Sequence, residues 1–342
     1  MRTITDFNDD WLFEGHTSVR LPHNAVDLPF SYFDERDYQR PFTCEKHFLA
    51  DPAWEGREVT LRFDGAMANA VVRQDGVVIA VHADGYTPFS ARLTGLTPGA
   101  HVIAVTVDGS ENPDIPPFGG VIDYLTYAGI YRKVWLEGSA PIRIGRVTVE
   151  TPDVLVDRKR LTARVWLHNP QDLPLAGRLR VDLLNGAGKV VASTEAEATA
   201  DLTLGFDGLS GINLWSPESP ALNTLALTLT TAQGSDTQAT RFGFRQVAFT
   251  AQGFHLNGKP LKLRGLNRHQ SFPYAGYALG RAAQERDAEI FLHDLRVNMV
   301  RTSHYPQSTH FLNRCDELGL LVFEEIPGWQ HIGGTKWQDE SV

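Results

Sequence analysis

Residues 1–139 alternate between apolar and polar positions over many short stretches. In the segment 59–63, Val59, Leu61 and Phe63 fall on one side of an extended chain, and polar residues stand between them. Alternation with a period of two is typical of a strand that buries one face. We therefore predict that this region forms an antiparallel β-sandwich of the jelly-roll type.

Asp-Gly pairs punctuate the same region. Asp75-Gly76 stands between the apolar runs 70–72 and 77–79. Both residues of such a pair accept the positive φ of a two-residue turn, so the pair predicts a tight hairpin. The same signal recurs at Asp64-Gly65, Asp84-Gly85 and Asp108-Gly109.

A second alternating pattern covers residues 140–246, where Leu161, Ala163 and Val165 share one face. Turn signals separate its strands, which favours a seven-stranded immunoglobulin-like sandwich of about 100 residues. The stretch Gly186-Ala-Gly-Lys189 has part of a phosphate-binding loop, but it lacks the first glycine of that motif and no helical pattern follows. We interpret it as a hairpin turn.

The last part of the chain, residues 247–342, changes to the period of a helix. A helix is predicted over residues 281–296, because one face of it collects Ala288, Phe291, Leu292 and Leu295. A second helix is predicted between Ser308, a typical N-cap, and Gly319, a typical C-terminal stop.

Apolar strands are predicted beside these helices, at residues 298–302 and 320–323. Strands and helices that alternate with short connections imply parallel strands and right-handed crossovers, as at the opening of a (β/α)8 barrel. Three parallel strands alone leave an edge unpaired and a layer partly uncovered. We therefore expect that the natural protein continues beyond residue 342 or that another chain covers this edge.

Two predicted barrel strands end abruptly in polar residues, in the segments Leu263–His269 and Arg301–Pro306. In parallel β/α units, the side chains at the C-terminal ends of the strands project into one crevice. His269 and His304 are therefore expected to converge, although they lie 35 positions apart.

Charge and composition narrow the choice of partners. The chain has 41 acidic against 32 basic residues, a net charge of −9, which disfavours nucleic acid and anionic membrane surfaces. No apolar run approaches the roughly 18 residues that span a bilayer. Cytoplasmic residence is the default expectation, and a periplasmic or secreted protein is left open if a signal peptide was removed. Cys44 and Cys315 are expected to be buried free thiols in different domains.

Short motifs in all three parts of the chain stand in a recognisable order. They are Tyr127–Arg132 with Asp123 upstream, Gly243-Phe-Arg245, Phe254–Pro260, Leu263–His269, Arg301–Pro306, Cys315–Gly319 and Phe323–Glu325. Together they resemble glycoside hydrolase family 2, which includes β-galactosidases and β-glucuronidases. The resemblance covers the whole chain.

The resemblance implies a multidomain, mainly β fold. It places a sugar-binding jelly-roll β-sandwich at 1–139, an immunoglobulin-like β-sandwich at 140–246, and the first three β/α units of an incomplete (β/α)8 barrel at 247–342. It implies a retaining β-glycosidase with a carbohydrate substrate, β-galactosidase-like before β-glucuronidase-like or β-mannosidase-like. A non-catalytic carbohydrate-binding protein and a homo-oligomer are also left open.

The resemblance also implies which residues meet the sugar. The family counterparts of His269 and His304 contact it, and Asp123 matches an acid that reaches from the jelly roll into the barrel mouth. In some β-galactosidases that acid touches sodium, so a sodium or magnesium ion is left open for the complete protein. No third ligand supports a metal site at the histidines. The alternatives are histidines that tie loops together and an Asp123 that caps a turn.

The two catalytic glutamates implied by the resemblance are expected outside this chain. The family's acid/base follows an asparagine, and no Asn-Glu dipeptide occurs between Met1 and Val342. Glu324 and Glu325 are neighbours on a strand, so they point to opposite faces and cannot bracket one glycosidic bond. We expect Glu325 to organise the barrel mouth by hydrogen bonds, and the 342-residue chain alone to be inactive.

Overall fold

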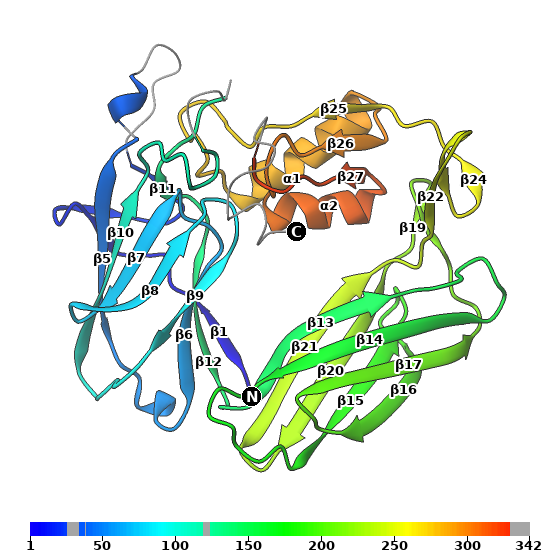
Figure 1. Cartoon of the computed structure of the whole chain (residues 1–342), viewed down its shortest axis with the longest axis horizontal. Coiled ribbons are helices and arrows are strands. Elements are labelled where there is room, and N and C mark those ends of the chain that lie inside the picture. Colours follow the sequence, from blue (N-terminus) through cyan, green and yellow to red (C-terminus); the bar gives the residue numbers. More distant parts are fainter. Residues whose placement is uncertain (26–33, 38, 119–123, 329–342) are drawn as a thin grey trace.

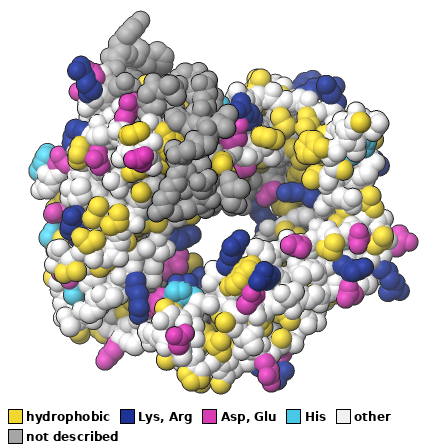
Figure 2. Space-filling view, in the orientation of Figure 1, with side chains coloured by type: hydrophobic (Ala, Val, Ile, Leu, Met, Phe, Trp, Pro, Cys, Tyr) yellow, Lys and Arg dark blue, Asp and Glu magenta, His cyan; other side chains and the backbone are white. Residues whose placement is uncertain are grey.

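The structure is a computed structural model that describes residues 1–25, 34–37, 39–118 and 124–328. Within these residues the chain forms two β-sandwiches and a β/α portion that carries the α-helices (Figure 1). The mainly β, multidomain organisation is therefore as predicted. The three bodies surround an opening at the centre of the molecule (Figure 2).

The first sandwich packs two antiparallel sheets face to face. Its strands are β1 (Thr3–Asp6), β2 (Trp11–Phe13), β3 (Thr17–Val19), β4 (His23–Asn24), β5 (Pro41–Leu49), β6 (Glu58–Phe63), β7 (Asn69–Gln74), β8 (Val77–Ala83), β9 (Phe89–Leu93), β10 (Ala100–Asp108), β11 (Gly129–Ile130) and β12 (Val134–Ser139). One sheet has the order β1-β12-β6-β9 and the other β3-β2-β5-β10-β7-β8, while β11 and β4 pair in a separate two-stranded ribbon. Val59, Leu61 and Phe63 on β6 are buried, as their alternation predicts.

Of the four Asp-Gly pairs, Asp75-Gly76 forms the predicted hairpin. Its residues have φ of 50° and 83° and join β7 to β8. The prediction is wrong for the other three pairs, because no positive φ occurs at Gly65, Gly85 or Gly109. Close packing explains two of these glycines. A Cβ would lie 2.2 Å from the sulfur of Met67 at Gly85, and 2.2 Å from the Cβ of Ala128 at Gly109.

The second sandwich also consists of two antiparallel sheets. Its strands are β13 (Arg143–Glu150), β14 (Lys159–His168), β15 (Gly177–Leu184), β16 (Val190–Glu197), β17 (Asp201–Leu209), β20 (Asn223–Thr231) and β21 (Gly234–Phe242). The sheets have the orders β13-β14-β17 and β16-β15-β20-β21. Residues 186–189 lie in the turn between β15 and β16, where the side chain of Asn185 accepts from the backbone N–H of Ala187 and Lys189. The hairpin interpretation is confirmed.

Short antiparallel ribbons lead into the β/α portion. They are β18 (Trp215–Ser216) with β19 (Ser219–Pro220), and β22 (Val247–Thr250) with β23 (Gly253–Leu256) and β24 (Lys259–Pro260). The β/α portion then contains β25 (Gly265–Asn267), α1 (Arg281–Glu289), η3 (Ile290–Asp294), β26 (Met299–Arg301), α2 (Thr309–Leu318) and β27 (Leu321–Phe323). The strands β25, β26 and β27 are neighbours in that order and run parallel, as predicted.

The two helices differ in how well they match the sequence pattern. Helix α2 begins after Ser308, whose hydroxyl accepts from the backbone N–H of His310, and ends at Gly319 with φ of 80°. Helix α1 continues beyond Glu289 as the π-helical turn η3, in which the Leu295 N–H donates to the Ile290 carbonyl. This wider turn rotates Leu295 off the packed face, so Leu295 is 50% exposed and the prediction that it is buried is wrong.

The two cysteines are free and buried, as predicted. Cys44 belongs to the core of the first sandwich and Cys315 to the core between the helices and the parallel strands. Burial raises the pKa of both thiols to about 12, so they remain protonated and pack as small apolar side chains.

A buried junction joins the first sandwich to the β/α portion. The guanidinium of Arg132 donates to the side-chain oxygen of Gln270 at 3.1 Å and to the carbonyl of Pro306 at 2.8 Å. Tyr86 stacks on Tyr305, with ring centroids 4.3 Å apart and planes 5° apart. Both rings are fully buried. The C-terminal ends of the parallel strands are therefore held against the first sandwich, the predicted jelly roll.

Candidate functional site

The predicted histidine pair lies where β25 and β26 end. These strands are in parallel register, with Asn267 opposite Arg301, and His269 and His304 follow them closely. The two imidazole centroids are 5.5 Å apart and the ring planes meet at 75°. The histidines thus converge, as the parallel topology predicts, while a contact with sugar stays a prediction.

Tyr124, from the jelly roll, forms an aromatic wall beside the pair. Its ring centroid lies 5.2 Å from that of His269, 5.7 Å from that of His304 and 5.6 Å from that of Tyr305. Sequence reasoning missed this residue, and its one signal was the aromatic stretch around Asp123. Asp123 itself lies outside the described residues, so its predicted role stays a prediction.

Glu325 links His304 to Arg301. One carboxylate oxygen lies 2.6 Å from Nε of Arg301 and the other 3.0 Å from Nδ1 of His304. The backbone N–H of Glu325 donates to the hydroxyl of Thr302 at 3.0 Å. Both carboxylate oxygens are therefore engaged, and the prediction that Glu325 organises the barrel mouth by hydrogen bonds is confirmed.

Glu324 faces a different space. Its carboxylate accepts from the backbone N–H of Gln307 at 3.2 Å. It lines a cleft between the jelly roll and the N-terminal ends of α1 and α2, together with Arg132 and Trp135. The two neighbouring carboxylates therefore do not flank one position. The prediction that both lie on a strand is wrong, because β27 ends at Phe323, and their different hydrogen-bond partners hold them apart instead.

Tyr305 contacts His269 of the pair. Its hydroxyl lies 3.4 Å from Nδ1 of His269 and accepts from the backbone N–H of Gln270 at 3.3 Å. Burial raises the pKa of the Tyr305 phenol, and burial also raises that of its neighbour Tyr277. Both therefore remain neutral phenols that donate and accept hydrogen bonds.

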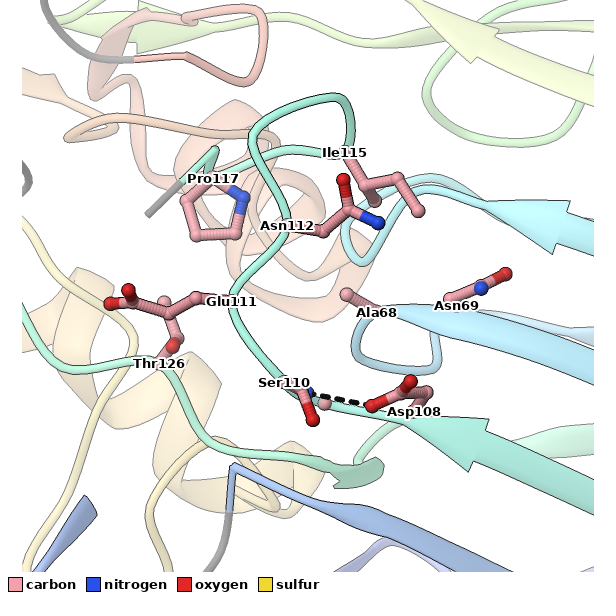
Figure 3. Close-up of a pocket in the computed structure, with 10 residues that line it drawn as sticks. Ala68, Asn69, Asp108, Ser110, Glu111, Asn112, Ile115, Pro117 and Thr126 are labelled. Atoms are coloured by element: carbon pink, nitrogen blue, oxygen red, sulfur yellow. Dashed lines mark hydrogen bonds between the residues drawn. The ribbon is translucent and has the colours of Figure 1, made fainter. Parts of the chain in front are cut away.

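A separate small pocket lies on the jelly roll, along the loop that follows β10 (Figure 3). It contains the carboxylates of Asp108 and Glu111, which point away from each other, and Asp108 accepts from the Ser110 backbone N–H at 2.9 Å. Nowhere in the described ranges do three or more His, Cys, Asp or Glu side chains gather into a set that could hold a metal ion. Among the helices of the described residues, none is long and apolar enough to cross a membrane.

In the described residues, fold and site together define a multidomain protein with two β-sandwiches and a parallel β/α portion, with paired histidines at its strand ends. The model of the TIM barrel domain of glycosyl hydrolases family 2 matches residues 247–339, and a second model of the same family matches residues 142–245. The chain belongs to this family. A predicted family resemblance is thereby confirmed.

Individual relatives show what share of a full-length family member this chain matches. It is 45% identical to a β-galactosidase of Rhizobium meliloti, over 98% of this chain and 46% of the relative. It is 42% identical to a β-galactosidase of Thermoanaerobacterium thermosulfurigenes, over 99% of this chain and 50% of the relative. The solved structure of Bacteroides uniformis β-glucuronidase 2 superposes with a TM-score of 0.86 at 28% identity, over 98% of this chain and 44% of that one. The chain thus spans about half the length of the proteins it matches.

Proposed function

We propose that this chain carries the sugar-binding part of a β-glycosidase active site and that a terminal β-galactoside is its substrate. The observation that carries the proposal is the convergence of His269 and His304, 5.5 Å apart at the ends of two parallel strands. Imidazole nitrogens donate hydrogen bonds to sugar hydroxyls or accept them. The wall formed by Tyr124 limits the space beside them, and both curated relatives described above are β-galactosidases.

In this proposal, the residues of this chain orient the sugar and do not break the bond. Retaining hydrolysis needs two carboxyl groups about 5–5.5 Å apart on either side of the bond. Glu324 and Glu325 face apart, and both oxygens of Glu325 are engaged by Arg301 and His304. The bond-cleaving carboxylates are therefore assigned outside this chain. The hydroxyl contacts made by the histidines strengthen as positive charge develops on the sugar ring.

A β-glucuronide is the second candidate, because a β-glucuronidase shares the fold. A glucuronide carries a carboxylate, which requires a cation or several N–H donors. Among the described residues, Arg301 is the cation that contacts His304, and its Nε already pairs with Glu325 at 2.6 Å. This pairing favours a neutral sugar.

Hydrolysis of chromogenic aryl β-glycosides tests the proposal. The 342-residue chain is expected to hydrolyse neither the β-galactoside nor the β-glucuronide, since its neighbouring carboxylates face apart. The protein expressed from the complete reading frame is expected to hydrolyse the β-galactoside faster than the β-glucuronide. Turnover by the 342-residue chain would overturn the division of roles. Turnover of the β-glucuronide alone by the complete protein would overturn the choice of substrate.

A further inference from the structure

We infer that Arg132 is a positioning residue for the paired histidines, because one of its terminal nitrogens holds both of the loops that carry them. The use of the pair on a sugar rests on the proposed function. The clamp itself rests on the contacts of Arg132 with the described residues. In this arrangement the first sandwich sets the spacing of two histidines that belong to the β/α portion.

The guanidinium of Arg132 is anchored within its own sandwich. Its Nη1 donates to the carbonyl of Tyr86 at 2.9 Å and to that of Asp64 at 3.4 Å. Its central carbon lies 5.1 Å from the ring centroid of Tyr131. Gly65 leaves room for the stem, since a Cβ there would lie 3.0 Å from Cδ of Arg132. These contacts fix the plane of the guanidinium at the edge of the first sandwich.

The other terminal nitrogen crosses the junction and meets both loops. Nη2 donates to the side-chain oxygen of Gln270 at 3.1 Å and to the carbonyl of Pro306 at 2.8 Å. Gln270 directly follows His269, and Pro306 lies two residues after His304. Because the two hydrogens of a planar guanidinium nitrogen point in fixed directions, the two acceptors are held at a fixed spacing.

Short and stiff links carry this restraint to the histidines. Gln270 is 1% exposed, and its backbone N–H donates to the hydroxyl of Tyr305 at 3.3 Å. Proline has a fixed φ and restricts the residue before it, so the segment from Tyr305 to Pro306 has little conformational freedom. The ring of Tyr305 also stacks on Tyr86 of the first sandwich, with centroids 4.3 Å apart. Movement of either loop therefore requires the clamp to open.

The contribution of Arg132 is its geometry more than its charge. In the described part of the chain its acceptors are carbonyl and amide oxygens, and no carboxylate pairs with it. A lysine would keep the charge, but its ammonium is a compact group on a flexible stem and lacks the rigid fork of donors. We therefore expect that Arg132→Lys does not preserve the spacing of the loops.

Crystal structures of the complete protein without any sugar test the clamp. The imidazole centroids are 5.5 Å apart in the wild type, and Arg132→Ala and Arg132→Lys are expected to displace His269 and His304 from this arrangement. Arg2→Ala is the matched control, because Arg2 also reaches from the first sandwich to another body, where it pairs with Asp236 at 2.8 Å. Its histidines should stay in place. Unmoved histidines in every folded Arg132 variant would overturn the inference.

Gln270→Ala tests the clamp from the other side of the junction. It removes the acceptor next to His269 but leaves Arg132 bonded to the carbonyl of Pro306, so the segment of His269 is expected to move and that of His304 to stay. Gln270→Glu keeps an acceptor oxygen and should keep the wild-type spacing. Equal movement of both histidines in Gln270→Ala, or of neither, would overturn a clamp that holds each loop by its own bond.

The affinity of the complete protein for a galactose-derived inhibitor separates this inference from the proposed function. Because a misplacement of about 1 Å at a site can cost about 100-fold, Arg132→Ala should bind the inhibitor about 10- to 100-fold more weakly than the wild type. Arg2→Ala should bind it as the wild type does. Displaced histidines with unchanged affinity would overturn the proposed function and leave the clamp standing.

Chemical rescue distinguishes positioning from a general loosening of the junction. Guanidinium chloride, at millimolar concentrations far below those that unfold proteins, is expected to restore the affinity of Arg132→Ala by occupying the place of the missing side chain. Ammonium chloride at the same concentration should not restore it. Equal restoration by the two salts, or an equal loss of affinity in Arg2→Ala, would overturn the positioning role of Arg132.

Discussion

Arg268 shows how a single residue holds the candidate site together from behind. It is 3% exposed, and its guanidinium lies 2.6 Å from a carboxylate oxygen of Asp287 and 4.1 Å from the ring centroid of Phe311. It also donates to the amide oxygens of Gln284 and Gln307. These partners belong to α1, to α2 and to the loop between β26 and α2, so one side chain ties the end of β25 to both helices.

Replacing Arg268 with Ala should destabilise the protein by about 2–4 kcal/mol, because it leaves buried acceptors without a donor. The expected loss lies somewhat below that for a fully buried pair, since Asp287 is 28% exposed and water reaches it. Urea denaturation measures the change. Arg286→Ala is the matched control, because Arg286 pairs with Glu289 and Asp294 at the surface and such pairs contribute about 1 kcal/mol or less. Equal losses in the two variants would contradict this role.

Residue patterns predicted the histidine pair but not its surroundings. His269 and His304 could be predicted because parallel strands bring their C-terminal ends together whatever the rest of the fold does. The position of Tyr124 could not be predicted, because Tyr124 belongs to the first sandwich and contacts the histidines across a domain junction. The pattern of apolar and polar residues along the sequence does not report such long-range contacts. The role of Arg268 was missed for the same reason, because its partners lie on two helices further along the chain.

At the scale of elements, locally encoded features were predicted well. Ser308 and Gly319 delimit α2 through their own side chain and φ, so its ends matched the prediction. No residue in the sequence marks the π-helical turn η3. The prediction assumed a regular α-helical period, which put Leu295 on the buried face, whereas the structure exposes it. The hairpin prediction failed at three Asp-Gly pairs for a similar reason. The sequence does not distinguish a glycine that is required for close packing from one that is required for a turn.

The β7–β8 hairpin gives a pH-dependent prediction. Asp75 accepts from the imidazole of His101 at 2.7 Å and from the backbone N–H of Val102 at 2.8 Å. The hydrogen bond to Asp75 raises the pKa of His101. A raised pKa means that protonated His101 stabilises the fold, fully at pH values below the unfolded value of about 6.5. This stabilisation is lost as the pH rises through the folded pKa.

Asp75→Asn should therefore lower the pKa of His101, because the amide keeps the turn but has no charge. An NMR titration of the His101 ring protons measures the midpoint. Asp172→Asn is the control, since Asp172 also has positive φ in a turn and lies far from His101 in sequence. An equal His101 midpoint in wild type and Asp75→Asn would contradict the account.

At the scale of the whole molecule, the candidate site belongs to two bodies at once. The histidines come from the β/α portion and Tyr124 from the jelly roll, and the two bodies are joined by Arg132 and by the stack of Tyr86 on Tyr305. The order of the three bodies could be predicted from changes of period along the chain. Their junction could not, because it depends on contacts between residues that lie more than 130 positions apart.

The most direct test of the account is the affinity of the complete protein for a galactose-derived transition-state mimic. His304→Phe is expected to weaken binding by about 1–3 kcal/mol through one unpaired hydroxyl, a loss of roughly 5–150-fold. His293→Phe, at an exposed position in η3, is the control and should bind as wild type does. Wild-type affinity in His304→Phe would contradict the central claim that the paired histidines hold the sugar.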